Sequence, residues 1–439
     1  MVSAQKRIAV VGTGIAGNGA AWALAVGSRH RLAVYEADGR AGGHAATVDV
    51  AYDDAPITVD TGFIVYNEPN YPNFTRLLAH LGIGTQASDM SFSVSDWEDS
   101  GSARLTWTSR PSRLLGGLVP NGIGIPSPVH LLVLRDLVRF NRSGVADLHA
   151  GRLEGLSLGD YLASRRFSRR FREDYVVAMG SAIWSMPPGD ILDFPAASFL
   201  SFFENHRLLR IERPTWRTVT GGSRTYVTAM TASFADGLRL DDPVRAVRRD
   251  AQGVEIVTAR GSERYDAVVL ACHSDQALAL LETPSAAERA VLGAIRYREN
   301  DVYLHRDRGL MPRDARSWAA WNVIKHSDDE VCVTYHMNAL QGIDPSRPLF
   351  VSLNPPRPPA PGSVFRTFSY AHPQFDQAAI AAQARLPEIQ GGGGVHFAGA
   401  WTKYGFHEDG LVSGLLAAEA LGATIPWRID PRSFAEAAE

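Results

Sequence analysis

Three glycines near the start of the chain have the spacing of a loop that binds phosphate. Gly12, Gly14 and Gly17 follow the apolar residues 8–11, which predict a buried strand, and the apolar-rich run up to Val26 predicts a helix. In such a G-x-G-x-x-G pattern the first glycine allows a tight turn, the second lets the backbone approach a pyrophosphate, and the third lets the helix pack closely on the strand. The helix would also direct its N-terminal amide groups at the phosphates.

An acidic residue ends the next predicted strand. The apolar residues 32–35 lead directly to Glu36, and a carboxylate in this position accepts hydrogen bonds from the ribose of a bound dinucleotide. Strand, helix, second strand and acid occur in the order of a βαβ unit, so the pattern predicts a dinucleotide site. NAD and FAD share this fingerprint.

The residues after Glu36 distinguish between the two cofactors. Arg40, Gly42 and Gly43 form an R-x-G-G element. It resembles the glycine-rich stretch after the second strand in FAD proteins of the flavin amine oxidase and phytoene desaturase superfamily. In those proteins the loop passes along the pyrophosphate and the ribityl chain. An arginine usually follows there, and this chain has His44 instead.

Two further motifs resemble the same superfamily. Residues 59–65 resemble the segment that reaches the flavin ring, although an ordinary strand and turn would have the same pattern. Residues 395–401 and 404–418 predict a strand, a loop and a helix rich in small residues, which match the C-terminal FAD motif. The resemblance implies that this helix directs its N-terminus at the flavin's C2 carbonyl, where its amides and dipole stabilise negative charge on the reduced ring. The three motifs together span nearly the whole chain.

The resemblance implies FAD as the cofactor, and we expect it to be bound non-covalently. Covalent members attach the flavin through a cysteine or histidine at defined places, and neither Cys272 nor Cys332 lies in the C-terminal motif. The backbone of Val244 is expected to meet the adenine. The residues that the motifs assign to the cofactor are Gly12, Gly14, Ile15, Ala16, Gly17, Glu36, Ala37, Arg40, Gly42, Gly43, His44, Thr61, Gly62, Phe63, Val244, Gly399, Ala400, Phe406 and His407.

The order of patterns predicts an α/β fold in which a Rossmann-like FAD-binding domain carries an inserted α+β substrate domain. Residues 111–210 are mostly helical in pattern, and residues 300–370 alternate as strands of an antiparallel sheet. We therefore predict a discontinuous FAD-binding domain and a substrate domain followed by a short tail. The FAD-binding segments are 1–70, 211–295 and 391–425, the substrate segments are 71–210 and 296–390, and the tail is 426–439.

A narrower resemblance concerns the substrate. Residues 59–67, 179–185, 221–226 and 404–410 resemble a bacterial group of predicted NAD/FAD-binding flavoproteins that are often encoded beside cyclopropane-fatty-acid-synthase-like methyltransferases. This resemblance implies hydride transfer between a C–H bond of a lipid or fatty acyl substrate and flavin N5, as in desaturation or related acyl-chain chemistry. Two alternatives are a flavin amine oxidase that releases peroxide and a non-catalytic flavoprotein partner of a lipid methyltransferase.

The candidate catalytic residues are His407, Phe406 and Tyr335. His407 could act as a base at neutral pH, or position 407 could contact the flavin through its backbone alone. Phe406 occupies a position where amine oxidases often place an aromatic residue of a cage beside the ring. Tyr335 lies on a predicted strand and could line the pocket or only complete the sheet. Trp184 and Met186 equally suit a pocket wall or a core.

Composition narrows the remaining classes of function. A formal net charge of −3 over 439 residues gives no reason to expect nucleic acid as a partner. Two isolated cysteines make no metal set, and together with the lack of a signal-like segment they predict a cytoplasmic protein. Residues 114–138 are rich in leucine and valine. This region predicts either core packing or a peripheral contact with the inner face of the membrane through which a lipid substrate would enter.

Overall fold

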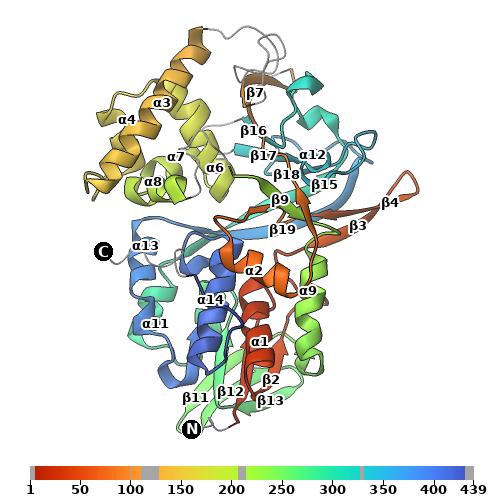
Figure 1. Cartoon of the computed structure of the whole chain (residues 1–439), viewed down its shortest axis with the longest axis vertical. Coiled ribbons are helices and arrows are strands. Elements are labelled where there is room, and N and C mark those ends of the chain that lie inside the picture. The colour runs from red at the N-terminus through yellow and green to blue at the C-terminus, as the bar shows by residue number, and fades with distance from the viewer. Residues whose placement is uncertain (1–4, 99, 110–127, 206–213, 327–330, 431–439) are drawn as a thin grey trace.

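A computed structural model describes residues 5–98, 100–109, 128–205, 214–326 and 331–430. Figure 1 shows two parts along the long axis, with β19 running between them. The lower part is a parallel sheet with helices, and the upper part is a larger sheet with a helical block. This arrangement confirms the predicted α/β fold.

A five-stranded parallel sheet forms the centre of the lower part. Its strands, in spatial order, are β10 (Leu238–Arg239), β2 (Arg31–Tyr35), β1 (Arg7–Val11), β14 (Ala267–Leu270) and β20 (Val395–Phe397). Each strand is short and nearly all apolar in its inner positions, as expected of a sheet that is covered on both faces. The start, middle and end of the chain therefore meet in one sheet, with the carboxyl ends of their strands at one edge.

Two parallel helices, α1 (Ile15–Gly27) and α14 (His407–Ala420), pack closely against each other on one face of this sheet. The contact requires glycine, because a Cβ on Gly414 would lie 2.0 Å from the carbonyl oxygen of Ala16. A Cβ on Gly410 would lie 2.7 Å from a methyl group of Ile15, so the two helices begin side by side. Both N-termini therefore open at the carboxyl edge of the parallel sheet.

A small antiparallel sheet covers the other face of the parallel sheet. Its strands are β11 (Ala246–Asp250), β12 (Gly253–Thr258) and β13 (Gly261–Tyr265). Residues 265–271 are divided between this sheet and the parallel sheet. Tyr265 pairs antiparallel with Val254, whereas Ala267 pairs parallel with Ile8. Asp266 turns the chain between the two sheets, and its carboxylate accepts a hydrogen bond from the amide of Arg7 at 2.7 Å.

The upper part contains a seven-stranded mixed sheet. Its strands, in spatial order, are β19 (Val364–Gln374), β15 (Arg296–His305), β18 (Phe350–Leu353), β17 (Val331–His336), β16 (Trp321–Lys325), β7 (Phe92–Glu98) and β8 (Ser102–Thr108). The expected strand over residues 317–324 is shorter than its pattern. Asp314 accepts a hydrogen bond from the amide of Arg316 and caps a 3₁₀ turn there, so β16 begins only at Trp321.

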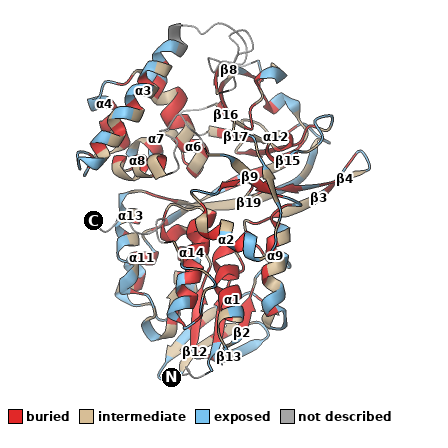
Figure 2. Cartoon of the chain, viewed as in Figure 1, coloured by how far each residue is buried: buried red, intermediate tan, exposed pale blue. Residues whose placement is uncertain are grey.

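A helical block packs on one face of this sheet, as the pattern of residues 111–210 predicted. Figure 2 shows the buried sides of these helices turned toward the sheet and toward one another. Val323 and Val333 on the sheet belong to the same apolar core as the helices. The elements are α3 (Pro128–His149), α4 (Leu158–Ser164), α5 (Arg169–Phe171), the π-helix η1 (Arg172–Val177), α6 (Ala178–Trp184), α7 (Pro188–Asp193) and α8 (Ala196–Asn205).

The remaining elements connect the two parts. The strands are β3 (Thr47–Tyr52) and β4 (Ala55–Asp60), which form a hairpin, and β5 (Tyr66–Asn67), β9 (Trp216–Val219) and β6 (Thr85–Ala87), which form a small sheet. The helices are α2 (Pro72–His80), α9 (Arg224–Thr231), α10 (Ser274–Leu280), α11 (Ala286–Leu292), α12 (Met337–Gln341) and α13 (Gln377–Ala384). The short 3₁₀ turns are η2 (Ala232–Gly237), η3 (Arg308–Leu310), η4 (Ala315–Ser317), η5 (Leu386–Glu388), η6 (Gly392–Gly394) and η7 (Ala400–Thr402).

The predicted domain division stays a prediction, but three of its segments pack differently from that assignment. Helix α2 was assigned to the substrate domain, yet Phe74 and Leu77 belong to the core of the parallel sheet because the apolar face of α2 lies against α1 and α14. Helix α13 packs on α11 in the same lower part. The described part of the tail, residues 426–430, also packs on the lower part, since Trp427 stacks on Trp22 of α1 with ring centroids 5.6 Å apart. Within the described residues, none of the helices has both the length and the apolar character of a membrane span.

Candidate functional site

The glycine loop leaves room for a ligand above the N-terminus of α1. A Cβ on Gly17 would lie 1.9 Å from the carbonyl oxygen of Gly12, so helix and strand are in backbone contact as predicted. No atom lies within 4 Å of the Cβ that Gly14 would carry. Ile15 and Ala16 begin α1 directly after this open position, and no side-chain hydrogen bond caps the N-terminus of the helix. The loop therefore fits a pyrophosphate.

Glu36 directs its carboxylate at the glycine loop. Its two oxygens accept hydrogen bonds from the amides of Thr13 at 2.9 Å and Asp38 at 3.0 Å. Glu36 is half-buried and Ala37 is exposed, so the acid remains open on one side. The Thr13 hydroxyl also donates to Oε2 of Glu36. A carboxylate has further acceptor positions beyond these three bonds, which suits the predicted contact with a ribose.

The R-x-G-G element and the ring segment both pack on the glycine loop. A Cβ on Gly43 would lie 3.1 Å from Cα of Gly14, and a Cβ on Gly62 would lie 2.1 Å from the carbonyl oxygen of His44. Arg40 donates to the carbonyl oxygen of Gly43 at 2.9 Å, so its guanidinium holds the loop's own backbone. The structure thus brings three predicted cofactor segments, around residues 12–17, 40–44 and 61–63, into contact.

A buried acid that the sequence analysis did not select fixes the ring segment. Asp60, only 1% exposed, accepts hydrogen bonds from Thr47 Oγ1 at 2.6 Å, Ser223 N at 3.0 Å and Gln341 Nε2 at 2.9 Å. Burial raises the pKa of this carboxyl group, while its hydrogen bonds act in the opposite direction. These hydrogen bonds join the segment 61–63 to the glycine-rich start of α9 at Gly221, Gly222 and Ser223.

The environment of His407 suits the backbone alternative better than a catalytic base. Its ring stacks on Phe63 with centroids 3.8 Å apart and an interplanar angle of 6°. Its Nε2 forms a hydrogen bond with the hydroxyl of Tyr226 at 2.7 Å. Burial lowers the pKa of His407 to about 3, far below the value near neutrality that makes a general base efficient. The role of His407 in catalysis stays a prediction.

Glu408 and Asp409 cap helices. Glu408 accepts hydrogen bonds from the amides of Asn73 at 2.8 Å and Phe74 at 2.9 Å, and so caps the N-terminus of α2. Asp409 accepts a hydrogen bond from the amide of Phe406 at 3.0 Å at the start of α14. Burial raises the pKa of both carboxyl groups to about 7. These two acids therefore set the position of the N-terminus of α14.

Phe406 and Tyr335 belong to one apolar cluster between the helical block and the large sheet. Phe406 stacks on Phe202 with centroids 4.9 Å apart. Tyr335 contacts the indole of Trp321 edge-on at 4.8 Å, and Trp321 Nε1 is buried without an acceptor among the described residues. Trp184 and Met186 are buried in the same cluster. The structure thus brings Phe406 and Tyr335 together and places His407 outside the cluster.

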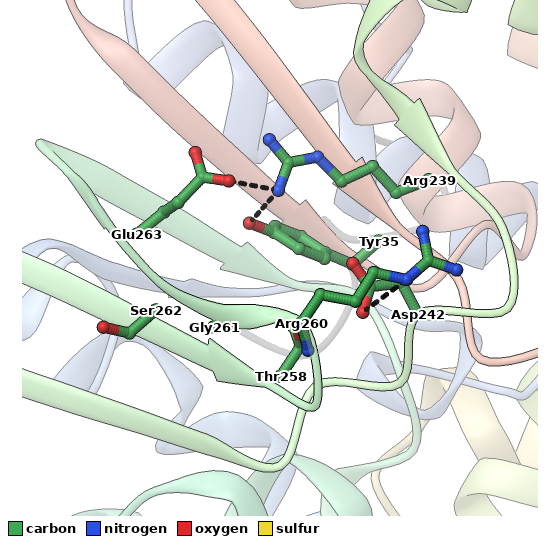
Figure 3. A pocket seen from close by; sticks show the side chains of 8 residues that line it. All are labelled: Tyr35, Arg239, Asp242, Thr258, Arg260, Gly261, Ser262 and Glu263. Carbon is green, nitrogen blue, oxygen red and sulfur yellow. Dashed lines mark hydrogen bonds and ion pairs between the residues drawn. The ribbon is translucent and has the colours of Figure 1, made fainter.

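Val244, whose backbone is predicted to meet the adenine, is half-buried and lies between β10 and β11. The chain comes close to Glu36 just before it, because the amide of Asp242 donates to the Glu36 carbonyl oxygen at 3.0 Å. A cavity of about 300 Å³ opens nearby (Figure 3). Its charged groups pair with one another, as in the contact of 2.5 Å between Arg239 and Glu263. None of the predicted site residues lines it, so it is separate from the predicted cofactor site.

Comparisons with known proteins agree with this geometry. The family model described as flavin-containing amine oxidoreductase matches residues 15–303. A comparison with curated protein sequences gave no match. Similar solved structures include putrescine oxidase bound to putrescine, with a TM-score of 0.67 and 15% identity over 95% of this chain and 99% of that one.

Two further solved structures are similar over nearly their full lengths. A CLA-producing fatty acid isomerase from P. acnes has a TM-score of 0.67 and 13% identity over 96% of this chain and 100% of its own. Cyclohexylamine oxidase from Brevibacterium oxydans IH-35A has a TM-score of 0.64 and 17% identity over 95% and 99%. At these identities the likeness establishes the fold.

Proposed function

The chain belongs to the flavin-containing amine oxidoreductase family, and from this premise we propose that it is an FAD-dependent oxidoreductase acting on a C–H bond of a lipid or fatty acyl chain. When bound, FAD supplies the hydride chemistry. The chain's own residues hold the cofactor, orient the substrate and exclude water. Non-covalent binding, the lipid substrate and each residue's role are parts of this proposal.

The observation that carries the substrate proposal is the apolar cluster around Phe406. It contacts the start of α14 on one side and includes Tyr335, Trp184 and Met186 on the other. Most of this cluster is packed core, and Phe406 and Tyr335 lie at its partly buried edge. An apolar edge of this kind gains free energy by covering methylene groups, about 0.8 kcal/mol per buried CH₂. A long acyl chain is therefore a better partner for it than a small polar substrate. The structural similarity to a fatty acid isomerase supports the same reading.

Amine oxidation is the second candidate. The family match and the similarity to putrescine oxidase favour it. Phe406 would then form one wall of an aromatic cage, because aromatic faces attract cations. A third proposal, a non-catalytic partner role for a lipid methyltransferase, comes from the narrower sequence resemblance alone.

One experiment separates the three candidates. The FAD-loaded protein is mixed without oxygen with phospholipids that carry unsaturated or saturated acyl chains, or with a panel of primary amines. Loss of the visible absorbance of oxidised flavin is recorded, and lipid products are identified by mass spectrometry. We expect bleaching and a changed acyl chain with lipid. Bleaching by amines alone, with peroxide formed in air, would establish amine oxidation, and lipid conversion that requires added methyltransferase would establish the partner role.

Peripheral membrane contact is a further part of the proposal. Of the apolar region 114–138, residues 114–127 lie outside the described residues. On α3, Leu131 is 57% exposed and Leu132 is 43% exposed, whereas Val133 is buried. The described part of this region therefore contains both exposed side chains and side chains that are buried in the core. Exposed leucines on one helix are the kind of surface that inserts among lipid headgroups.

We expect Leu132→Glu to reduce flotation of the protein with anionic liposomes by at least half, because a carboxylate resists burial among acyl chains. FAD content and thermal stability should stay unchanged, since Leu132 is on the surface. Val26→Glu is the matched control, because Val26 is 47% exposed on α1, and α1 lies in the lower part of the molecule whereas α3 lies in the upper part (Figure 1). Equal flotation of all three proteins, or none with the wild type, would refute the membrane proposal.

A further inference from the structure

Three histidines from distant parts of the sequence face one another. His44 follows the R-x-G-G element, His273 follows β14, and His372 lies on β19. The ring of His44 lies 5.5 Å from that of His372 and 6.3 Å from that of His273, measured between centroids. Tyr370 joins the group at 5.0 Å from His44. Among the described residues no group has the geometry to hold a metal ion, so another explanation is needed.

The histidine cluster, defined here as His44, His273 and His372, lies at the carboxyl edge of the parallel sheet. His273 comes just after the end of β14, beside the strand that leads into the glycine loop. Gly43, the neighbour of His44, packs on Gly14. Ligands of open parallel sheets bind outside the carboxyl ends of the strands. The cluster therefore borders the place where the glycine loop would hold the cofactor's pyrophosphate.

The cluster contains an unused hydrogen-bonding group. His44 Nε2 is buried and has no partner among the described residues. The other two rings are engaged, since His372 Nδ1 lies 3.1 Å from Asn300 Nδ2 and His273 stacks on Tyr297 at 4.4 Å. A buried polar atom without a partner costs free energy, so it commonly marks a missing ligand or function.

Without a ligand all three rings are neutral at neutral pH. Burial lowers the pKa of His44 to about 3 and that of His372 to about 4, and it lowers the pKa of His273 as well. The neighbouring histidines and the Arg40 guanidinium lower the pKa of His44 further, while Asp275 acts in the opposite direction on His273.

The other polar and titratable groups near the cluster add no strong anion to it. They are Tyr370, whose hydroxyl contacts Thr61, and His407, Tyr297 and Cys272. Asp275 acts on His273, whereas the charged groups that act on His44 are the other two histidines and Arg40. A bound pyrophosphate would therefore bring an anion to His44, and an anion near an imidazole favours its protonated form.

We propose that the histidine cluster makes FAD binding proton-linked: His44 takes up a proton from solvent when the pyrophosphate binds, and so becomes a cation beside the bound anion. No electron is transferred, and the proton leaves when the cofactor leaves. The proposal concerns cofactor binding alone, so it stands or fails independently of the substrate. Because the pKa of His44 is higher with FAD than without it, FAD affinity is greatest at low pH and falls as pH rises through the pKa of the bound state.

Calorimetric titration of FAD into the apoprotein tests the proposed proton uptake and the pH dependence of FAD affinity. Each titration is run at one pH in two buffers with different heats of ionisation, so that the difference in heat gives the number of protons taken up. We expect an uptake approaching one proton for the wild type, and an affinity that falls up to about tenfold per pH unit over the linked range. Equal heats in both buffers at every pH from about 5.5 to about 8.5 would overturn the proposal.

Two variants assign the proton. His44→Arg supplies a fixed charge, so we expect FAD binding without proton uptake and with little dependence on pH. His44→Gln should bind FAD more weakly at low pH, again without uptake. His30→Gln is the control, because His30 contacts the carbonyl oxygen of Leu421 away from the cluster. Thermal unfolding of each apoprotein confirms folding, and unchanged uptake in both His44 variants would overturn the assignment.

Discussion

Gly14→Ala is expected to leave the apoprotein as stable as the wild type and to weaken FAD binding by about 10- to 100-fold, because overpacking costs about 1–3 kcal/mol. The added methyl group meets no protein atom within 4 Å, and the backbone of Gly14 has an ordinary negative φ of −59°. The methyl would instead occupy space that the pyrophosphate needs. Thermal unfolding of the apoprotein and FAD titration by fluorescence quenching measure the two effects separately.

Gly17→Ala gives the matched contrast. Its methyl group would lie 1.9 Å from the carbonyl oxygen of Gly12 and 3.2 Å from the Cβ of Ala271. Backbone must move to relieve the first contact, so we expect the apoprotein itself to lose about 3 kcal/mol or more of its free energy of unfolding. If Gly14→Ala kept wild-type FAD affinity, the cofactor would not pass over this position. Equal stability of the two apoproteins would show that the close contact of helix and strand is not required.

The second large effect is expected for Glu408→Ala. The substitution leaves the amides of Asn73 and Phe74 and the side-chain amide of Asn73 without their acceptor. Each buried donor left unsatisfied costs about 1–3 kcal/mol, so we expect a loss of at least about 3 kcal/mol, measured by chemical denaturation. Glu408→Gln keeps an acceptor oxygen and should cost much less. Glu419→Ala, an exposed position on the same helix, should change stability little.

The raised pKa of Glu408 also predicts how the free energy of unfolding depends on pH. The pKa of Glu408 is about 7 in the folded protein, above its ordinary value of 4.5. A carboxyl group whose pKa is raised by folding stabilises the protein below the unfolded pKa, and that contribution is lost as pH rises through the folded pKa. Stability should therefore fall between about pH 4.5 and pH 7 and fall less steeply in Glu408→Gln. Identical pH profiles would show that Glu408 is already ionised when folded.

Local sequence patterns determined the parts of the fold that depend on short-range rules. The spacing of Gly12, Gly14 and Gly17 requires a strand, a tight turn and a helix in that order, and the structure has all three. The acidic residue at the end of the second strand and the last helix with its small residues were also predicted from local patterns. The resemblance of the first and last motifs to one superfamily also implied that they serve one ligand, and each leads a strand into a helix N-terminus.

Long-range packing decided what local patterns left open. A histidine beside a cofactor motif is a candidate base by its type, but only the fold buries His407 against Phe63 and Tyr226 and so lowers its pKa. Glu408 lies in the first turn of α14, but the structure uses it to cap α2 from 335 positions away.

The histidine cluster is the clearest example of a feature that the sequence alone could not predict. His44, His273 and His372 lie in segments whose patterns are an irregular loop, a strand end and an alternating strand, and no periodicity links them. Their proximity follows from the parallel pairing of β1 with β14 and from the path of β19 across the carboxyl edge of that sheet. The sequence by itself determined the cofactor class and the strand–helix units that carry it. Only the tertiary structure decided which side chains surround the ligand and how burial sets their charge, because both depend on contacts between residues far apart in the chain.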